Sequence, residues 1–340
     1  MTTLVIHRMN QSVNSIGFLR LVLALMVIYA HAFALGGFGY DPLYRWSGDV
    51  FSTGAIAVDG FFLLSGFLIT SSYLRLKSLP QFLWHRALRI FPGYWACLVV
   101  TAIGLPLLWG RYPQLGYIKS NFWLIQQQTA LTGLLATNPL PNQVNGSLWT
   151  LGHEFRAYLI VGLLGCFGLL TRRFIFGLLL LAWLAYVATY YTDQPLMVIV
   201  VFKFLSHFFA GGMFYLWQPR LNSLFACVSL VVAGGTLVSN LYPLVSPVTT
   251  GYLLLWLAIA LPCSGFGRVR DYSYGFYIYA FPVQQTLTAY GFNRWGYFSY
   301  FLFSIVCTLP LAGLSWHLIE KPFLRLKQWH PKIEKLKVGI

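Results

Sequence analysis

The sequence contains few charged residues and very few acidic ones. Only 9% of its 340 residues are charged, with eight Asp or Glu against 23 Lys or Arg, while 58% are hydrophobic. Soluble domains carry roughly 25% charged residues, so the composition excludes a soluble globule of this length. The cysteines lie singly in apolar stretches, without the spacing of a disulfide framework or a metal centre, and we expect no metal site.

Long apolar runs recur along the whole chain. A run of about 20 apolar residues spans a bilayer as a helix, and a helix satisfies its own backbone polar groups there. The sequence therefore predicts an all-α, polytopic transmembrane helical bundle that forms one membrane-embedded domain over residues 1–340. We expect the spans within 15–318 and a basic cytoplasmic tail at 319–340. About ten spans are predicted, at 15–36, 53–74, 91–109, 149–170, 174–191, 196–217, 222–241, 248–262, 272–290 and 297–318.

The formal net charge of +15 reflects membrane orientation. On a soluble protein it would suggest nucleic acid, but here the basic residues cluster between apolar runs, and membrane lipids rather than nucleic acid are the expected surroundings. If the N-terminus is cytoplasmic, the predicted outside segments hold only Arg45, Arg111, Lys119 and Arg294. This asymmetry predicts that both termini are cytoplasmic. The long outer segment 110–148 contains apolar stretches beside three glutamines, and we expect a re-entrant or interfacial helix that lines a substrate cavity.

Arg20 and His31 are charged or titratable residues within the first predicted span. Such residues are costly in a membrane and indicate a functional cavity. They are 11 residues apart, so on a helix they share one face with about 16 Å between them along the axis. Histidine is a common general base, and an arginine at the inner end suits an anionic cofactor. A snorkelling arginine and a packing histidine are the structural alternative.

Asp59 and Glu154 are acidic residues predicted within the second and fourth spans. Asp59 lies at a depth comparable with that of His31, and either pairs with a cation or orients an imidazole. Glu154 suits proton transfer or a hydrogen bond to a sugar hydroxyl. Lys203 and His207 share a face of the sixth span, and structural pairing with either acid is as consistent with the pattern as a catalytic role.

Small and basic residues complete the set of candidates. Ser65 and Gly66 in the second span permit close helix approach. Arg86 and Arg89, spaced i, i+3 in a segment predicted to be cytoplasmic, are helix neighbours. Two arginines at the inner end of a bundle suit a phosphate-rich ligand, although ordinary positive-inside charge would give the same pattern.

These segments together resemble the acyltransferase 3 family, bacterial multi-span membrane O-acyltransferases of surface polysaccharides and related glycosides. The resemblance covers about residues 14–325. It rests on five elements in the family's order: Arg20 with His31, Ser65-Gly66-Phe67, Arg86 with Arg89, Ser147-Leu148-Trp149 with Glu154, and Glu320-Lys321-Pro322. The chain departs from the family at Tyr279-Ala280-Phe281-Pro282, where many members carry Trp-His-Phe-Pro, so a mechanism with a second histidine is not expected here.

The resemblance implies a multi-pass enzyme of the bacterial inner membrane. It would transfer an acetyl or other short acyl group from cytoplasmic acyl-CoA, with acetyl-CoA as the expected donor, to a hydroxyl of a cell-surface or lipid-linked carbohydrate. Polysaccharide-assembly proteins are further expected partners. His31 would be catalytic, with Asp59 and Glu154 orienting it or the sugar. Arg20, Arg86, Arg89 and Ser65 would serve the acyl-CoA side.

Two other functions fit the same intramembrane charges. A transporter or flippase of a lipid-linked or anionic sugar would use them as a binding site, although the sequence shows no inverted repeat. A non-catalytic scaffold for polysaccharide assembly is the second alternative.

Overall fold

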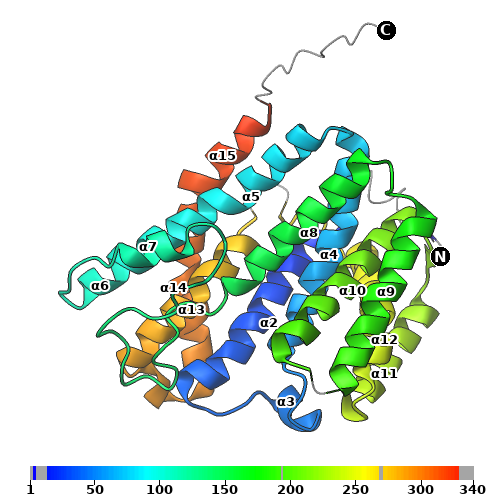
Figure 1. Ribbon diagram of the computed structural model, residues 1–340. Helices are drawn as coiled ribbons and strands as arrows, with labels where there is room; N and C mark the ends of the chain where they lie inside the picture. Colours follow the sequence, from blue (N-terminus) through cyan, green and yellow to red (C-terminus); the bar gives the residue numbers. More distant parts are fainter. Residues whose placement is uncertain (1–2, 5–13, 193, 268–270, 329–340) are drawn as a thin grey trace, which may run out of the picture.

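The computed structural model describes residues 3–4, 14–192, 194–267 and 271–328. Arg8, Arg268, Arg270 and the 329–340 part of the predicted basic tail lie outside these ranges. The described chain is almost entirely helical, and its long helices pack side by side as a bundle (Figure 1). The expected all-α fold is confirmed, apart from one short antiparallel pairing between β1 (Thr3–Leu4) and β2 (Arg220–Leu221).

Each predicted span overlaps a long helix, although the bounds differ most at the third. These are α2 (Ile16–Gly36), α4 (Thr53–Leu76), α5 (Leu79–Val99), α8 (Trp149–Cys166), α9 (Arg172–Tyr191), α10 (Leu196–Trp217), α11 (Ser223–Val238), α12 (Tyr242–Ala260), α13 (Ser273–Ala289) and α14 (Tyr297–Ser315). Among the described residues, seven helical stretches are long and apolar enough to cross a membrane, and α8, α11 and α13 are not among them. The chain is thus a multi-pass membrane protein, while ten spans and cytoplasmic termini stay predictions.

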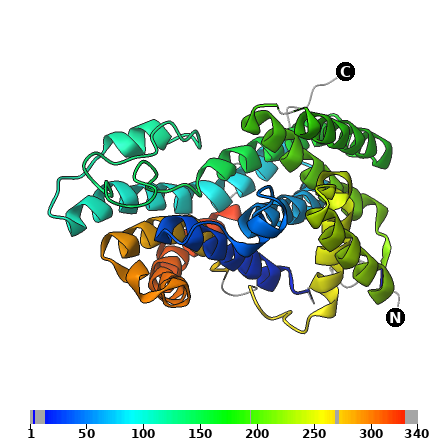
Figure 2. The same ribbon diagram turned by 90° about the horizontal axis from the view of Figure 1, so that it is seen from below.

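Helices α2 and α4 occupy the centre of the bundle. Helix α2 packs against α4, α13 and α14, and α4 packs against α10, which in turn contacts α9 and α12. Viewed along the bundle, α2 and α4 therefore lie between the α13–α14 layer and the α9–α12 layer (Figure 2). A short helix, α3 (Pro42–Trp46), connects them at one end (Figure 1). The two predicted catalytic side chains on α2 and α4 are thus carried by the central pair.

The third helix begins earlier than the sequence pattern predicted. The segment with Arg86 and Arg89 was expected to precede a span that starts at 91, but α5 begins at Leu79 and includes both arginines. Pro80 lies in the first turn, where a missing N–H costs nothing. Pro92 is then inside the helix rather than at its start. Beyond Val99 the chain continues as a π-helical turn, η1 (Val100–Gly104), and α6 (Leu105–Leu108).

Residues 110–148 do not form the expected re-entrant or interfacial helix. Only α7 (Gly116–Asn121) is helical, and the remainder is a series of turns. Leu124, Leu131 and Leu134 are nevertheless buried in the core. The Asn121 side chain donates to the backbone oxygens of Tyr117 and Gln128, both at 3.0 Å. Side-chain bonds such as these satisfy part of the backbone in this segment, and turn-type backbone bonds satisfy more of it, because each buried backbone group needs a partner.

Helices α4 and α10 approach each other through two glycines. A Cβ atom added at Gly66 would lie 1.8 Å from the backbone oxygen of Phe208, and one added at Gly211 would lie 2.0 Å from that of Leu63. Both obstacles are main-chain atoms, which a side-chain rotation cannot move. The close approach expected at Gly66 is confirmed, and it fixes Asp59 on α4 relative to Lys203 on α10.

We expect Gly66→Ala and Gly211→Ala to destabilise the protein by about 1–3 kcal/mol, the usual cost of overpacking, because either methyl group must force α4 and α10 apart. Thermal unfolding of the purified protein in detergent would measure this as a lower midpoint. Gly177→Ala on α9 is the matched control, because nothing lies within 4 Å of its added Cβ. Equal midpoints for all three variants would contradict the packing argument.

The remaining short elements lie near the end of the chain. They are η2 (Phe292–Trp295) between α13 and α14, and then the π-helical η3 (Trp316–Glu320), α15 (Lys321–Arg325) and η4 (Leu326–Gln328), which continue from α14. Element η3 packs against α5, and α15 does so as well. This contact brings Glu320, from the last part of the described chain, beside Arg89 of α5.

Candidate functional site

A cavity of about 920 Å³ lies at the α3 end of the bundle, between α2, α4, α8, α9 and α10. His31 is in its wall, near the C-terminal end of α2. The irregular segment 110–148 contributes Gln126 and Gln143 to the lining, as expected for that segment although not through a helix. Much of the rest is aromatic and comes from several elements: Tyr40, Tyr44, Trp149, Tyr186, Tyr190, Phe204 and Tyr277.

His31 lies in this wall without a hydrogen bond to any described residue. Its contact is an edge-on packing against the ring of Phe281, with 5.1 Å between the ring centroids. Ala280, where the resembling family often has histidine, is buried in a small apolar cluster with Ala24 and Ile28. The imidazole nitrogens of His31 are therefore free to interact with a molecule in the cavity, and α13 supplies no second imidazole at Ala280.

Asp59 is buried beside the cavity and pairs with a cation. Its Oδ1 atom lies 3.0 Å from Nζ of Lys203, and its Oδ2 atom lies 4.0 Å from Nε2 of His207. The first of the two alternatives for Asp59 is therefore observed. Among the described residues, Asp59 has no contact with His31. The structure therefore gives no support to a role for Asp59 in directly orienting the His31 imidazole. Lys203 lines the cavity, whereas Asp59 lies behind it.

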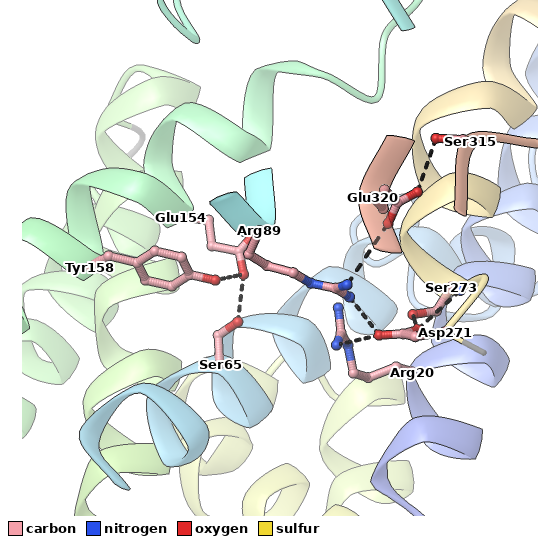
Figure 3. Close-up of polar contacts among 9 residues, drawn as sticks. All are labelled: Arg20, Ser65, Arg89, Glu154, Tyr158, Asp271, Ser273, Ser315 and Glu320. Atoms are coloured by element: carbon pink, nitrogen blue, oxygen red, sulfur yellow. Dashed lines mark hydrogen bonds and ion pairs between the residues drawn. The ribbon is translucent and has the colours of Figure 1, made fainter. Parts of the chain in front are cut away.

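Glu154 and Ser65 meet in the middle of the bundle. Oε1 of Glu154 accepts hydrogen bonds from the hydroxyls of Ser65, at 2.6 Å, and Tyr158, at 2.5 Å (Figure 3). Neither Glu154 nor Ser65 is among the described residues that line the cavity. Ser65 is halfway along α4, between the end with Asp59 and the end with Arg75. The structure thus joins two predicted site residues, but away from His31.

Four charged side chains from distant parts of the sequence form an ion-pair cluster. Oδ2 of Asp271 lies 3.1 Å from Nη1 of Arg20 and 2.5 Å from Nη2 of Arg89. Nη1 of Arg89 is also 3.8 Å from Oε2 of Glu320, whose other oxygen accepts from Ser315 at 3.0 Å. Figure 3 shows Arg89 between the two carboxylates. Arg89 therefore contacts two carboxylates, and Arg20 shares one of them.

The cluster keeps Asp271 ionised. Burial by itself would raise the pKa of this carboxyl, but Arg20 and Arg89 and a hydrogen bond from Ser273 hold the pKa well below its usual range. Arg20 and Arg89 therefore already share an ionised carboxylate as their partner. Asp271 was missed by the sequence reasoning. The chain has only eight acidic residues, and Asp271 directly follows a basic segment before α13. That position was a signal in the sequence that Asp271 pairs with arginine.

Arg86 differs from the two clustered arginines. Its guanidinium lies over the ring of Phe82, at 5.9 Å from the centroid, and its buried Nε atom has no hydrogen-bond partner among the described residues. Among the three predicted donor-side arginines, Arg86 is the one without a carboxylate within 4.0 Å in the described structure. Its charge is therefore the most available of the three for an anionic ligand.

Arg20 and His31 were expected to face one passage. They do lie on one helix, with Arg20 in its first turns and His31 near its end. However, the described residues that line the cavity include His31 and not Arg20, which is held in the ion-pair cluster instead. The structure therefore shows two polar regions at the two ends of α2, with the Glu154 group between them.

Comparison with known proteins gives concordant matches. A family model described as "Acyltransferase domain" matches residues 13–317. A protein named "O-acetyl transferase" from Shigella phage Sf6 is 30% identical over 319 residues, covering 90% of this chain and 94% of that protein. "Nodulation protein 10" from Rhizobium leguminosarum bv. viciae is 29% identical over 358 residues, covering 92% and 94%. No solved structure matches the chain.

Proposed function

This chain belongs to the acyltransferase family and is an O-acetyltransferase by its similarity, and on that premise we propose that it moves an acetyl group from acetyl-CoA to a hydroxyl of a cell-surface or lipid-linked carbohydrate. We place it in the bacterial inner membrane, with the ion-pair cluster at the cytoplasmic face. Acyl-CoA, the carbohydrate acceptor and membrane lipids are its proposed partners, and polysaccharide-assembly proteins are candidates for others.

The observation that carries the proposal is the environment of His31. A histidine with unengaged ring nitrogens lines a cavity large enough for a sugar residue, at the end of the bundle opposite the arginines. Ligand pockets typically measure about 300–1,000 Å³ and combine an apolar lining with a few polar groups. An aromatic wall with glutamines matches the alternation of apolar faces and hydroxyls on a sugar ring.

The chemistry follows from the position of that imidazole. As a general base, His31 takes the proton of the acceptor hydroxyl while the oxygen attacks the thioester carbonyl. The carbon–sulfur bond then breaks, and the departing CoA thiolate takes the proton back from His31. As a nucleophile, His31 would instead hold the acetyl group briefly on a ring nitrogen. Both sequences end with free CoA thiol and an acetyl ester.

The donor would bind at the opposite end of α2. CoA carries several phosphates, which arginine and lysine side chains bind through charge-assisted hydrogen bonds. We assign the first contact to Arg86, because the guanidinium groups of Arg20 and Arg89 are already paired with carboxylates. Those two arginines, with Asp271, would shape the entrance. The thioester would then pass the Ser65–Glu154 group to reach His31, so we assign Glu154 and Ser65 to this route.

The proposal is tested by purified protein with radiolabelled acetyl-CoA and surface glycan from cells that lack the chain. The expected result is release of free CoA together with label in the glycan. Mass spectrometry of glycans from cells with and without the chain should show a matching acetyl-sized difference. Movement of glycan across vesicle membranes without consumption of thioester would instead establish a transporter. If the protein showed neither acetyl transfer nor transport, the scaffold alternative would remain.

A further inference from the structure

Lys203 is the side chain that brings a positive charge to the wall of the His31 cavity. Among the described lining residues, the other ionised group is Asp41, which caps the start of α3. Asp41 accepts from the backbone N–H groups of Tyr44 and Thr53, both at 2.9 Å. Both carboxylate oxygens of Asp41 are thus engaged by backbone N–H groups. Lys203 is the other charged side chain in the described lining, and it is available to a ligand in this cavity.

The charge of Lys203 is matched from the buried side. Its Nζ atom is 3.0 Å from Asp59, whose residue is 1% exposed and which does not line the cavity. An ammonium has three N–H donors, so a single carboxylate contact leaves donors available. His207 completes the buried group, with Nδ1 2.8 Å from the backbone oxygen of Lys203. The pair therefore presents N–H groups to the cavity without a net charge.

This arrangement discriminates between acceptor groups. An acidic sugar or a phosphate in the cavity would draw Lys203 away from Asp59 and leave a buried carboxylate without its cation, which is costly. A neutral hydroxyl accepts a hydrogen bond from the ammonium without disturbing the pair. Discrimination of this kind rests on the penalty against the wrong ligand as much as on attraction for the right one.

The aromatic lining fits the same class of ligand. The rings of Tyr40 and Tyr44 are stacked at 4.7 Å at the α3 end, and Tyr40 is 62% exposed. Trp149 and Phe204 pack together beside Lys203, with the Phe204 ring centroid 5.5 Å from its Nζ atom. Apolar faces with few polar groups bind uncharged rings without the desolvation cost of an ion.

We propose that Lys203, anchored by Asp59, binds hydroxyl groups of the acceptor, and that this pair selects an uncharged sugar residue for the His31 cavity. The inference rests on the proposed function and names the acceptor class for the same site. Lys203 is a binding residue and Asp59 its positioning partner. In a lipid-linked acceptor, the phosphate would then stay outside this cavity.

Two measurements test the inference. First, tandem mass spectrometry of the glycan acetylated in cells should place the acetyl group on a residue without carboxylate or phosphate. An acetylated uronate or phosphorylated residue would overturn the selectivity while leaving the proposed function intact. Absence of any acetylated product would overturn the proposed function, and this inference with it.

Second, kinetics should separate binding from structural pairing. Lys203→Met leaves the buried Asp59 carboxylate without its cation and should lower the unfolding midpoint. The double variant Lys203→Met/Asp59→Asn removes both charges, and its midpoint should return toward that of the wild type. With glycan from cells lacking the chain as acceptor, we expect the double variant to keep a KM for the glycan raised about tenfold or more, with the KM for acetyl-CoA unchanged. Lys119→Met, at an exposed site on α7, is the control. A normal glycan KM in the double variant would refute the binding role.

Discussion

Replacing His31 with alanine is expected to abolish acetyl transfer while the protein remains folded. The side chain makes no hydrogen bond to described residues, and its packing contact is the ring of Phe281, so its loss removes chemistry rather than structure. Removal of a general acid–base group costs about 10²–10⁴ in rate, and loss of an acyl carrier would cost more. The measurement is release of free CoA by the purified variant, with its unfolding midpoint recorded alongside.

The matched control is His317→Ala, because His317 is exposed on η3 and bonds to the hydroxyl of Tyr272 outside the cavity. That variant should turn over normally. Rapid quenching of wild-type enzyme with labelled acetyl-CoA and no acceptor separates the two roles of His31, since label on the protein appears only if the ring carries the acetyl group. A His31→Ala enzyme with near-normal turnover would remove His31 from the mechanism.

Replacing Asp271 with asparagine is expected to have the second large effect, a loss of stability of about 3 kcal/mol, the lower end for breaking a buried ion pair. The change keeps the shape but leaves Arg20 and Arg89 next to each other with only Glu320 to balance them. The pKa of Asp271 is held below its usual range, so this charge is present at any ordinary assay pH. A fall in the unfolding midpoint measures the effect.

Arg86→Ala should behave in the opposite way. Because Arg86 has no carboxylate partner among the described residues, its loss should spare the midpoint and raise the KM for acetyl-CoA.

Asp49→Asn, at an exposed site by α3, is the control for the Asp271 change. If Asp271→Asn left the midpoint unchanged and instead lowered the KM for acetyl-CoA, Asp271 would be a competitor of the donor phosphates rather than a structural anion.

The helices were the most predictable feature of this protein. In a membrane the backbone polar groups must be satisfied within the segment, so long apolar runs form helices, and every predicted span overlaps one. The boundaries were less certain where apolarity is not the cause of helix formation. The first half of α5 carries arginines. The helix packs against α8, η3 and α15, and no local sequence pattern contains those contacts.

The prediction of a helix within the irregular segment 110–148 was wrong, because long-range contacts rather than local pattern decide its conformation. Leu124, Leu131 and Leu134 are buried there without a helix or strand around them. The Asn121 side chain bonds to the backbone of Gln128, and the Asn138 side chain bonds to the backbone and side chain of the distant Gln285. Such bonds join residues up to 147 positions apart, and hydrophobic periodicity carries no information about them. The same limit applies to Glu154, whose partner Ser65 is 89 positions away.

The sequence by itself determined that this is a helical membrane protein with a small number of intramembrane polar residues, because composition and run length dictate what a bilayer accepts. It also placed Arg20 and His31 on one helix, since that geometry is local. Only the tertiary structure decided which charges neutralise each other: Asp271 with Arg20 and Arg89, and Asp59 with Lys203. Ion pairing depends on distances of a few ångströms between separate helices, and those distances exist only once the helices have packed.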